Sequence, residues 1–141
     1  MNKQKIGNIA FDIILCFICI GFIIGFINFS LKGEPLNIWG IKPMVILSGS
    51  MEPEIDLNSL VVTYKTENIK KGDIIMFQTR TKDYVVHRYY DDNDDGSIIT
   101  KGDSNEIADY DPVDKNQVFG KVIIRMNFMA PYITFFKNLI H

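Results

Sequence analysis

The sequence predicts a mainly β protein, in which a single N-terminal transmembrane helix is followed by one antiparallel β-sheet domain with a barrel-like form. Three observations support this fold class. The length of 141 residues suits one domain. An uncharged apolar run occupies residues 13–31. Beyond it, short segments rich in Val, Ile, Tyr and Phe alternate with turn residues, without long helical periodicity.

Residues 13–31 have the length and composition of one bilayer span. A helix rising ~1.5 Å per residue would extend about 29 Å here, close to the roughly 30 Å hydrocarbon core of a membrane. A cleaved signal peptide is the competing interpretation, because a positive segment precedes the run. The run exceeds the usual apolar region of such a peptide, and no small-x-small cleavage site follows it. We therefore expect residues 1–31 to be a cytoplasmic segment and an uncleaved anchor.

The charges that flank the apolar run predict its orientation. Lys3 and Lys5 precede the run, whereas Lys32 on its other side is offset by Glu34. By the positive-inside rule, the N-terminus is then cytoplasmic and the domain that follows is extracytoplasmic.

Cys16 and Cys19 form a CxxC motif inside the apolar run. In lipid this pair has neither water nor further ligands, so apolar packing is favoured over redox or metal chemistry. The residues after the run contain no cysteine, so a disulfide cannot stabilise the outward domain.

Beyond the anchor, composition divides the chain further. Residues 32–43 are punctuated by glycine and proline, which predicts an irregular linker near the lipid. Trp39 within it suits either the membrane interface or the domain core. Residues 44–127 form the β-rich domain. Its expected strands are Ser59–Tyr64, Asp73–Gln78, Tyr84–Tyr90, Ser97–Thr100 and Val118–Arg125.

The C-terminal segment, residues 128–141, is apolar but too short to span a bilayer. Two placements stay open. The segment either lies in the membrane interface, with Tyr132, Phe135 and Phe136 among the headgroups, or packs against the β-rich domain.

The first candidate for chemistry is the Ser-Gly-Ser turn at residues 48–50, which follows an apolar run and precedes Met51. Gly49 permits unusual backbone dihedrals. Such a turn can align a serine hydroxyl with nearby N–H donors, as an oxyanion site requires. The motif alone is a weak signal, because Ser-Gly pairs also mark ordinary loops.

A nucleophilic serine needs a base, and the sequence contains two histidines. His141 is the last residue, where chains are usually frayed. His87 lies in a β pattern that places Val85, His87 and Tyr89 on one face. A single histidine of this kind is more often structural, but any imidazole base must be His87.

A carboxylate would fix the tautomer of this histidine and stabilise its protonated form. Residues 100–111 follow a strand and contain Asp103 and Asp109 among their acidic side chains. Asp103 could simply cap a turn, which leaves Asp109 as the freer candidate. Spacing alone does not decide between the two.

Three motifs together resemble the boxes of type I signal peptidases: SGSMEP at residues 48–53, VVHR at residues 85–88, and KGDSN at residues 101–105 with a second aspartate after it. The similarity is to the endoplasmic-reticulum-like branch of that family, which uses histidine where the commonest bacterial members use a lysine base. The order of anchor, serine box, histidine strand and Gly-Asp box also agrees. The resemblance extends from the anchor to about Gly120.

This resemblance implies a membrane-bound serine endopeptidase that removes N-terminal leader peptides from exported preproteins, after small residues at the −1 and −3 positions. It implies Ser50 as nucleophile and His87 as general base. Asp109 matches the third catalytic position, with Asp103 as the alternative or as a structural support. Ser48 matches a serine whose hydroxyl can join the Ser50 N–H in the oxyanion hole.

The resemblance makes residues 44–127 the catalytic domain, with secretory preproteins and the lipid bilayer as partners and no metal or organic cofactor.

A formal charge of −2, without a Lys/Arg-rich run, argues against nucleic acid as a partner. The DDNDDG segment at residues 91–96 matches the start of an EF-hand loop but lacks its closing glutamate. A hairpin turn explains the same residues.

Two alternative functions stay open. A membrane-tethered β domain that only binds would account for the anchor and the strands, but not for the serine, histidine and aspartates in family order. A self-cleaving regulator peptidase with a serine/lysine dyad would look similar around the serine, but the apolar run and His87 argue against it.

Overall fold

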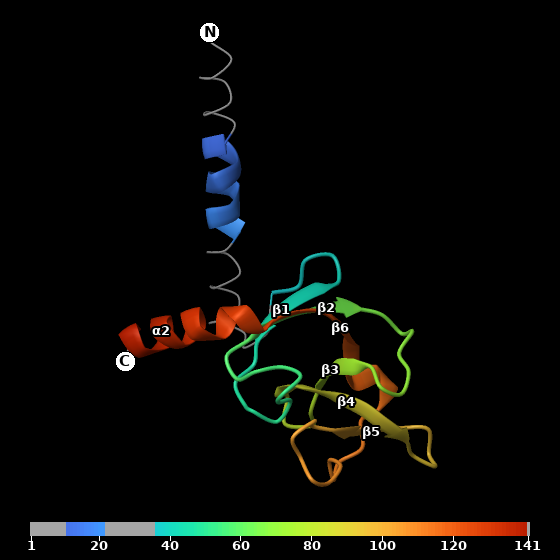
Figure 1. Ribbon diagram of the computed structural model, residues 1–141. Helices are drawn as coiled ribbons and strands as arrows, with labels where there is room; N and C mark the ends of the chain where they lie inside the picture. Colours follow the sequence, from blue (N-terminus) through green and yellow to red (C-terminus); the bar gives the residue numbers. More distant parts are fainter. Residues whose placement is uncertain (1–10, 22–35, 141) are drawn as a thin grey trace. The chain divides into compact units, whose positions relative to one another are not determined.

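The computed structural model describes residues 11–21 and 36–140 (Figure 1). The chain divides into two compact units, Met1–Leu36 and Asn37–His141. In the first unit, residues 11–21 are helical, and residues 22–31 of the expected membrane span lie outside the described residues. Within the described part of the chain, no helix combines the length and apolar character needed to cross a membrane.

The second unit is built on one six-stranded antiparallel sheet (Figure 1), which confirms the expected mainly β class. In the sheet the order is β1-β2-β6-β3-β4-β5, so β1 and β5 are its edges. A helix, α2, follows the last strand. The elements are β1 (Ile41–Val45), β2 (Leu60–Lys65), β3 (Ile74–Gln78), β4 (Tyr84–Asp92), β5 (Ile98–Lys101), η1 (Lys115–Gln117), β6 (Val118–Met126), η2 (Asn127–Met129) and α2 (Ala130–Ile140).

β1 is the strand that was not predicted from the sequence. Its residues include Pro43, which lacks the N–H that a central strand must donate to a neighbour. Because β1 lies at an edge and pairs only with β2, Pro43 is tolerated opposite Val62. The five strands that were predicted are all present, with ends displaced by at most two residues.

The sheet curves enough to bring β1 close to β4, which is not its neighbour in the sheet. Lys42 in β1 is buried, and its Nζ donates to the Tyr84 hydroxyl of β4 at 3.3 Å. The same ammonium lies over the rings of Tyr84 and Phe119, 4.6 and 4.1 Å from their centroids. In the part of the chain described, the form is therefore a curved sheet and not a barrel closed by pairing of its two edge strands; the outer edge of β5 is partly covered by the segment that follows it, through the Ile98–Val113 bridge.

Two apolar clusters lie on the two sides of β3, whose first four residues are buried. One cluster contains Met76 together with Met51, the residue that follows the Ser-Gly-Ser turn. The other contains Phe77 together with Val113, which closes the loop after β5. The turn that carries Ser50 and the loop that follows β5 are thus each anchored to the core by a buried side chain.

Candidate active site

Ser50 lies in the turn that leaves β1. The backbone of Ile46 exchanges two hydrogen bonds with the chain before β2, to the Ser59 carbonyl at 2.9 Å and from the Asn58 N–H at 2.8 Å. Met51, directly after Ser50, is fully buried. These contacts fix both sides of the turn, while Ser50 itself stays partly exposed.

His87 lies near the middle of β4, opposite Ile75 of β3. Its side chain is 12% exposed, and its Nε2 is 3.1 Å from the Ser50 hydroxyl oxygen. The Phe77 ring and the imidazole lie in an edge-type, T-shaped arrangement at a centroid distance of 6.5 Å. A strand with buried neighbours therefore holds the imidazole beside the serine.

Asp109 comes from the irregular segment after β5. One oxygen of its carboxylate, Oδ2, is 2.6 Å from His87 Nδ1. A carboxylate only accepts, so Nδ1 carries the proton and Nε2 of the neutral ring accepts from the Ser50 hydroxyl. This line of hydroxyl, imidazole and carboxylate can withdraw a proton from Ser50 and stabilise the resulting imidazolium.

Asp103 lies elsewhere, beside Arg88 of β4. The guanidinium donates from Nε to Oδ1 at 2.8 Å and from Nη2 to Oδ2 at 2.6 Å. Its third donor, Nη1, reaches the carbonyl of Gly72 at 2.7 Å. The hydrogen bonds that Arg88 donates to Asp103 raise the pKa of Arg88, against the opposing effect of burial. Asp103 thus supports the fold around the site, and its pairing with Arg88 was not predicted from the sequence.

The turn after β5 is attached to the serine turn. Ser104 donates from its backbone N–H to the Ser50 carbonyl at 3.0 Å and from its hydroxyl to the Gly49 carbonyl at 2.8 Å. A Cβ on Gly102 would come within 2.6 Å of the Ser50 carbonyl oxygen, so only glycine fits here without displacement. These contacts hold the two turns together, and the Arg88–Asp103 pair ties the second turn to β4.

Ser48 is exposed, and its hydroxyl oxygen lies 3.1 Å from that of Ser50. Its hydroxyl therefore lies next to the oxygen that would attack a carbonyl. The residues expected to supply an oxyanion site, Ser48 and Ser50, are brought together by the turn that joins them.

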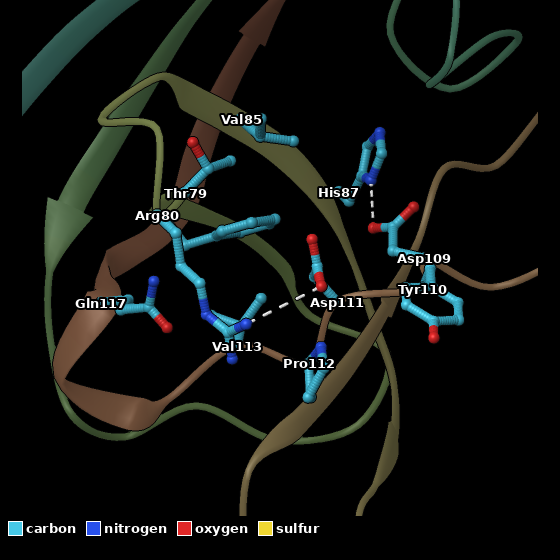
Figure 2. A pocket seen from close by; sticks show the side chains of 11 residues that line it. Thr79, Arg80, Val85, His87, Asp109, Tyr110, Asp111, Pro112, Val113 and Gln117 are labelled. Atoms are coloured by element: carbon cyan, nitrogen blue, oxygen red, sulfur yellow. Dashed lines mark hydrogen bonds and ion pairs between the residues drawn. The ribbon is translucent and has the colours of Figure 1, made fainter.

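A cavity of about 300 Å³ lies beside the imidazole and carboxylate. Figure 2 shows His87 and Asp109 along one side, with Val85 and Val113 among the apolar residues of the lining. The site therefore continues from His87 into a partly apolar recess.

The acidic segment at residues 91–96 comprises the end of β4 and the turn that leads into β5, so it belongs to a hairpin. Lys71 forms ion pairs with Asp91 at 2.5 Å and Asp92 at 3.3 Å. The hydrogen bond from Lys71 lowers the pKa of Asp91, and hydrogen bonds from Tyr89 and then Lys71 lower the pKa of Asp92. In residues 11–21 and 36–140, no group of three or more His, Cys, Asp or Glu side chains could hold a metal ion.

Comparison with known proteins gives one family match and several relatives. The family described as Peptidase S24-like matches residues 44–123, which include all the candidate site residues. Signal peptidase I W of Bacillus subtilis is 35% identical over 121 residues, covering 82% of this chain and 63% of that protein. The human signal peptidase complex catalytic subunit SEC11C is 37% identical over 73 residues, covering 47% of this chain and 38% of that protein.

The SEC11 catalytic subunit of Fusarium vanettenii is 28% identical over 105 residues, covering 64% of this chain and 60% of that protein. The chain thus matches less than two thirds of the length of these relatives. The expected resemblance to signal peptidases, including the endoplasmic-reticulum type, is confirmed by these similarities. Because the family match spans more than half of its residues, the chain belongs to the Peptidase S24-like family.

Proposed function

We propose that this protein is a membrane-bound serine endopeptidase that removes N-terminal leader peptides from exported preproteins. The observation that carries the proposal is the hydrogen-bonded line from Ser50 through His87 to Asp109, with distances of 3.1 and 2.6 Å. The names of its relatives, signal peptidase I W and the SEC11 catalytic subunits, support leader peptides as the substrate class.

In the proposed reaction, His87 takes the hydroxyl proton as Ser50 Oγ attacks the scissile carbonyl. The Ser50 N–H and the Ser48 hydroxyl then stabilise the oxyanion of the tetrahedral intermediate. His87 returns the proton to the leaving amine, which leaves an acyl group on Ser50. A water molecule, deprotonated by His87, hydrolyses this ester and regenerates the enzyme.

Asp109 is the proposed third member of this triad, because its carboxylate contacts the imidazole directly. Both oxygens of Asp103 are occupied by Arg88, which supports a role in holding the turn rather than orienting the base. Spacing alone did not decide which aspartate is the third catalytic residue. In this proposal Asp109 orients the base and Asp103 holds the turn.

The edge position of β1 supports a mode of substrate binding. An extended peptide can add to a free strand edge through backbone hydrogen bonds. The chain passes directly from this edge strand to the turn that carries Ser50, so a peptide paired there would run toward the nucleophile.

We place the catalytic domain on the extracytoplasmic side of the membrane, with the N-terminus in the cytoplasm, on the charges around residues 13–31. An anchor of this kind would confine enzyme and preprotein to the same bilayer and shorten their search for each other. Exposed aromatic side chains along α2, Tyr132 and Phe135, support contact of this helix with the lipid interface.

The proposal is tested by cleavage of a model preprotein in reconstituted membranes. We expect Ser50→Ala to lose turnover while its membrane recovery and unfolding temperature stay unchanged. Ser59→Ala is the matched control, because the Ser59 hydroxyl is buried and has no hydrogen-bond partner within residues 36–140. A serine-reactive acylating probe should label Ser50 in the wild type. Cleavage by Ser50→Ala, or absence of both cleavage and labelling in the wild type, would refute the proposal.

A further inference from the structure

Thr100 is a buried polar residue that lies directly behind the His87–Asp109 pair. It belongs to β5, in which Ile98 and Thr100 face inward, and its side chain is fully buried. A hydroxyl at such a position costs free energy unless it forms a hydrogen bond. The Thr100 hydroxyl donates to Asp109 Oδ2 at 2.6 Å.

The acceptor of this bond is the oxygen that also receives the proton of His87 Nδ1. A carboxylate can only accept, so the Thr100 hydroxyl and the His87 N–H both point at Oδ2 as donors. The Asp109 backbone N–H also donates to the Thr100 carbonyl at 2.8 Å. Thr100 therefore holds both the main chain and the carboxylate of Asp109.

This attachment matters because Asp109 lies outside any strand, in the irregular segment that follows β5. β5 is paired with β4, the strand that carries His87, and Thr100 lies opposite Tyr89 in the register. The hydroxyl thus ties the carboxylate to the strand pair that also fixes the imidazole. A group oriented by a hydrogen bond to a rigid element keeps its geometry better than a group on a loop alone.

We propose that Thr100 is a positioning residue for the reaction, holding the Asp109 carboxylate in the orientation that His87 requires. This inference rests on the proposed function. Without the hydroxyl, the Asp109 carboxylate would keep its charge. It would be oriented toward His87 in only part of the molecules. The predicted loss is therefore in kcat, because Thr100 is buried behind Asp109 and does not face the substrate.

The test compares Thr100→Val, which keeps the side-chain shape but removes the hydroxyl, with Thr100→Ser, which keeps the hydroxyl. We expect Thr100→Val to lower kcat about 10- to 100-fold with KM unchanged, as for loss of a hydrogen bond to a charged group. Thr100→Ser should restore most of the activity. Thr63→Val is the matched control, because Thr63 is fully buried and its hydroxyl has no partner within residues 36–140.

A second readout does not depend on turnover. A proton shared between imidazole Nδ1 and a carboxylate gives a resonance far downfield of the amide protons in the NMR spectrum. We expect this resonance in the wild type, in Thr63→Val and in Thr100→Ser. In Thr100→Val it should broaden or move, with the remainder of the spectrum and the unfolding temperature close to those of Thr63→Val.

The outcomes separate this inference from the proposed function. If the wild type cleaves and Thr100→Val matches Thr63→Val in kcat and in the downfield resonance, Thr100 has no positioning role. If Thr100→Val and Thr100→Ser lose activity equally, the hydroxyl is not the cause and the inference is overturned. An inactive wild type that still shows the downfield resonance would refute the peptidase proposal instead.

Discussion

At the scale of single residues, the two aspartates after β5 differ in the partners that surround them. Asp109 receives hydrogen bonds from His87 and Thr100, whereas Asp103 receives two from Arg88. The first carboxylate can therefore respond to a charge that appears on the imidazole during a reaction. The second is matched to a guanidinium whose charge is permanent.

This difference predicts opposite consequences for the two asparagine variants. Asp109→Asn should lower kcat by about 10⁴-fold, because an amide does not stabilise the imidazolium and allows the wrong tautomer. Asp103→Asn should retain more activity and instead lower the free energy of unfolding by about 1–3 kcal/mol, because Arg88 loses a charged acceptor. Steady-state cleavage and urea unfolding of both variants check this. Equal losses of kcat would contradict the assignment.

Spacing predicted which residues could form the site, but it could not rank Asp103 against Asp109. Both lie in a segment without regular secondary structure, so no periodicity relates either one to the face of β4 that carries His87. The ranking depends on contacts with Arg88 and Thr100. Arg88 lies in the VVHR segment, but a single sequence does not show which aspartate either residue contacts. Ser50 and His87 were easier candidates, because a serine turn and one internal histidine left few rivals.

At the scale of elements, strand composition predicted five of the six strands. The missed strand, β1, contains a proline, and its place at the sheet edge is a property of the whole topology rather than of local sequence. The burial of Lys42 could not be predicted either. A lysine in a polar setting is usually solvated, and the rings of Tyr84 and Phe119 reach it from strands far away in sequence.

Lys42 joins β1 to β4 through its ammonium and its aliphatic stem. Lys42→Met keeps most of the stem but removes the cation–π contacts and the bond to Tyr84, so we expect unfolding to become easier by about 0.5–2 kcal/mol. Lys42→Ala should cost more, because packing is lost as well. Thermal unfolding of the two variants measures this order. A Lys42→Met protein that unfolds at or above the wild-type temperature would contradict it.

The β4–β5 hairpin predicts a dependence of stability on pH. Folding lowers the pKa of Asp91 and Asp92 below their ordinary value of 3.8, chiefly through hydrogen bonds from Lys71 and Tyr89. Such groups bind fewer protons in the folded chain, so their contribution is present above pH 3.8 and is lost as pH falls through the lowered pKa.

Lys71→Met removes the cation of this cluster. We expect its unfolding temperature to lie below that of the wild type near neutral pH, with a gap that closes as both carboxyls are protonated in acid. Thermal unfolding across this range provides the measurement, and Lys70→Met is the control. The neighbouring lysine belongs to none of the ion pairs found within residues 36–140. If the difference in unfolding temperature between the wild type and Lys71→Met does not change with pH, the ion pairs of Lys71 with Asp91 and Asp92 do not contribute to stability.

At the scale of the whole second unit, the candidate site is assembled from a turn after β1, the middle of β4 and the segment after β5. Ser50 and His87 are 37 residues apart, and His87 and Asp109 are 22 apart. The direct link between the first and last of these segments is the pair of hydrogen bonds from Ser104, with Gly102 packed beside them. Movement of one turn should therefore displace the other.

Gly102→Ala tests this coupling. Its methyl group would overlap the Ser50 carbonyl and the Asn105 amide, at 2.6 and 2.7 Å, so one of the two turns must shift. We expect a loss of at least tenfold in kcat, because small displacements of a nucleophile are costly. Ser104→Ala is the milder comparison, since it removes the bond to Gly49 and keeps the backbone bond to Ser50. Wild-type turnover in Gly102→Ala would show that the turns move independently.

The pairing of β4 with β5 has a consequence for biosynthesis. During synthesis, Ser50 and then His87 leave the ribosome before Thr100 and Asp109, which orient the imidazole in the proposed site. Until Thr100 and Asp109 have emerged and the hairpin has closed, the early part of the domain lacks its carboxylate. β6, which joins β2 to β3 in the sheet, follows both residues in the chain, so hydrolytic competence would be acquired later still, once β6 has completed the sheet.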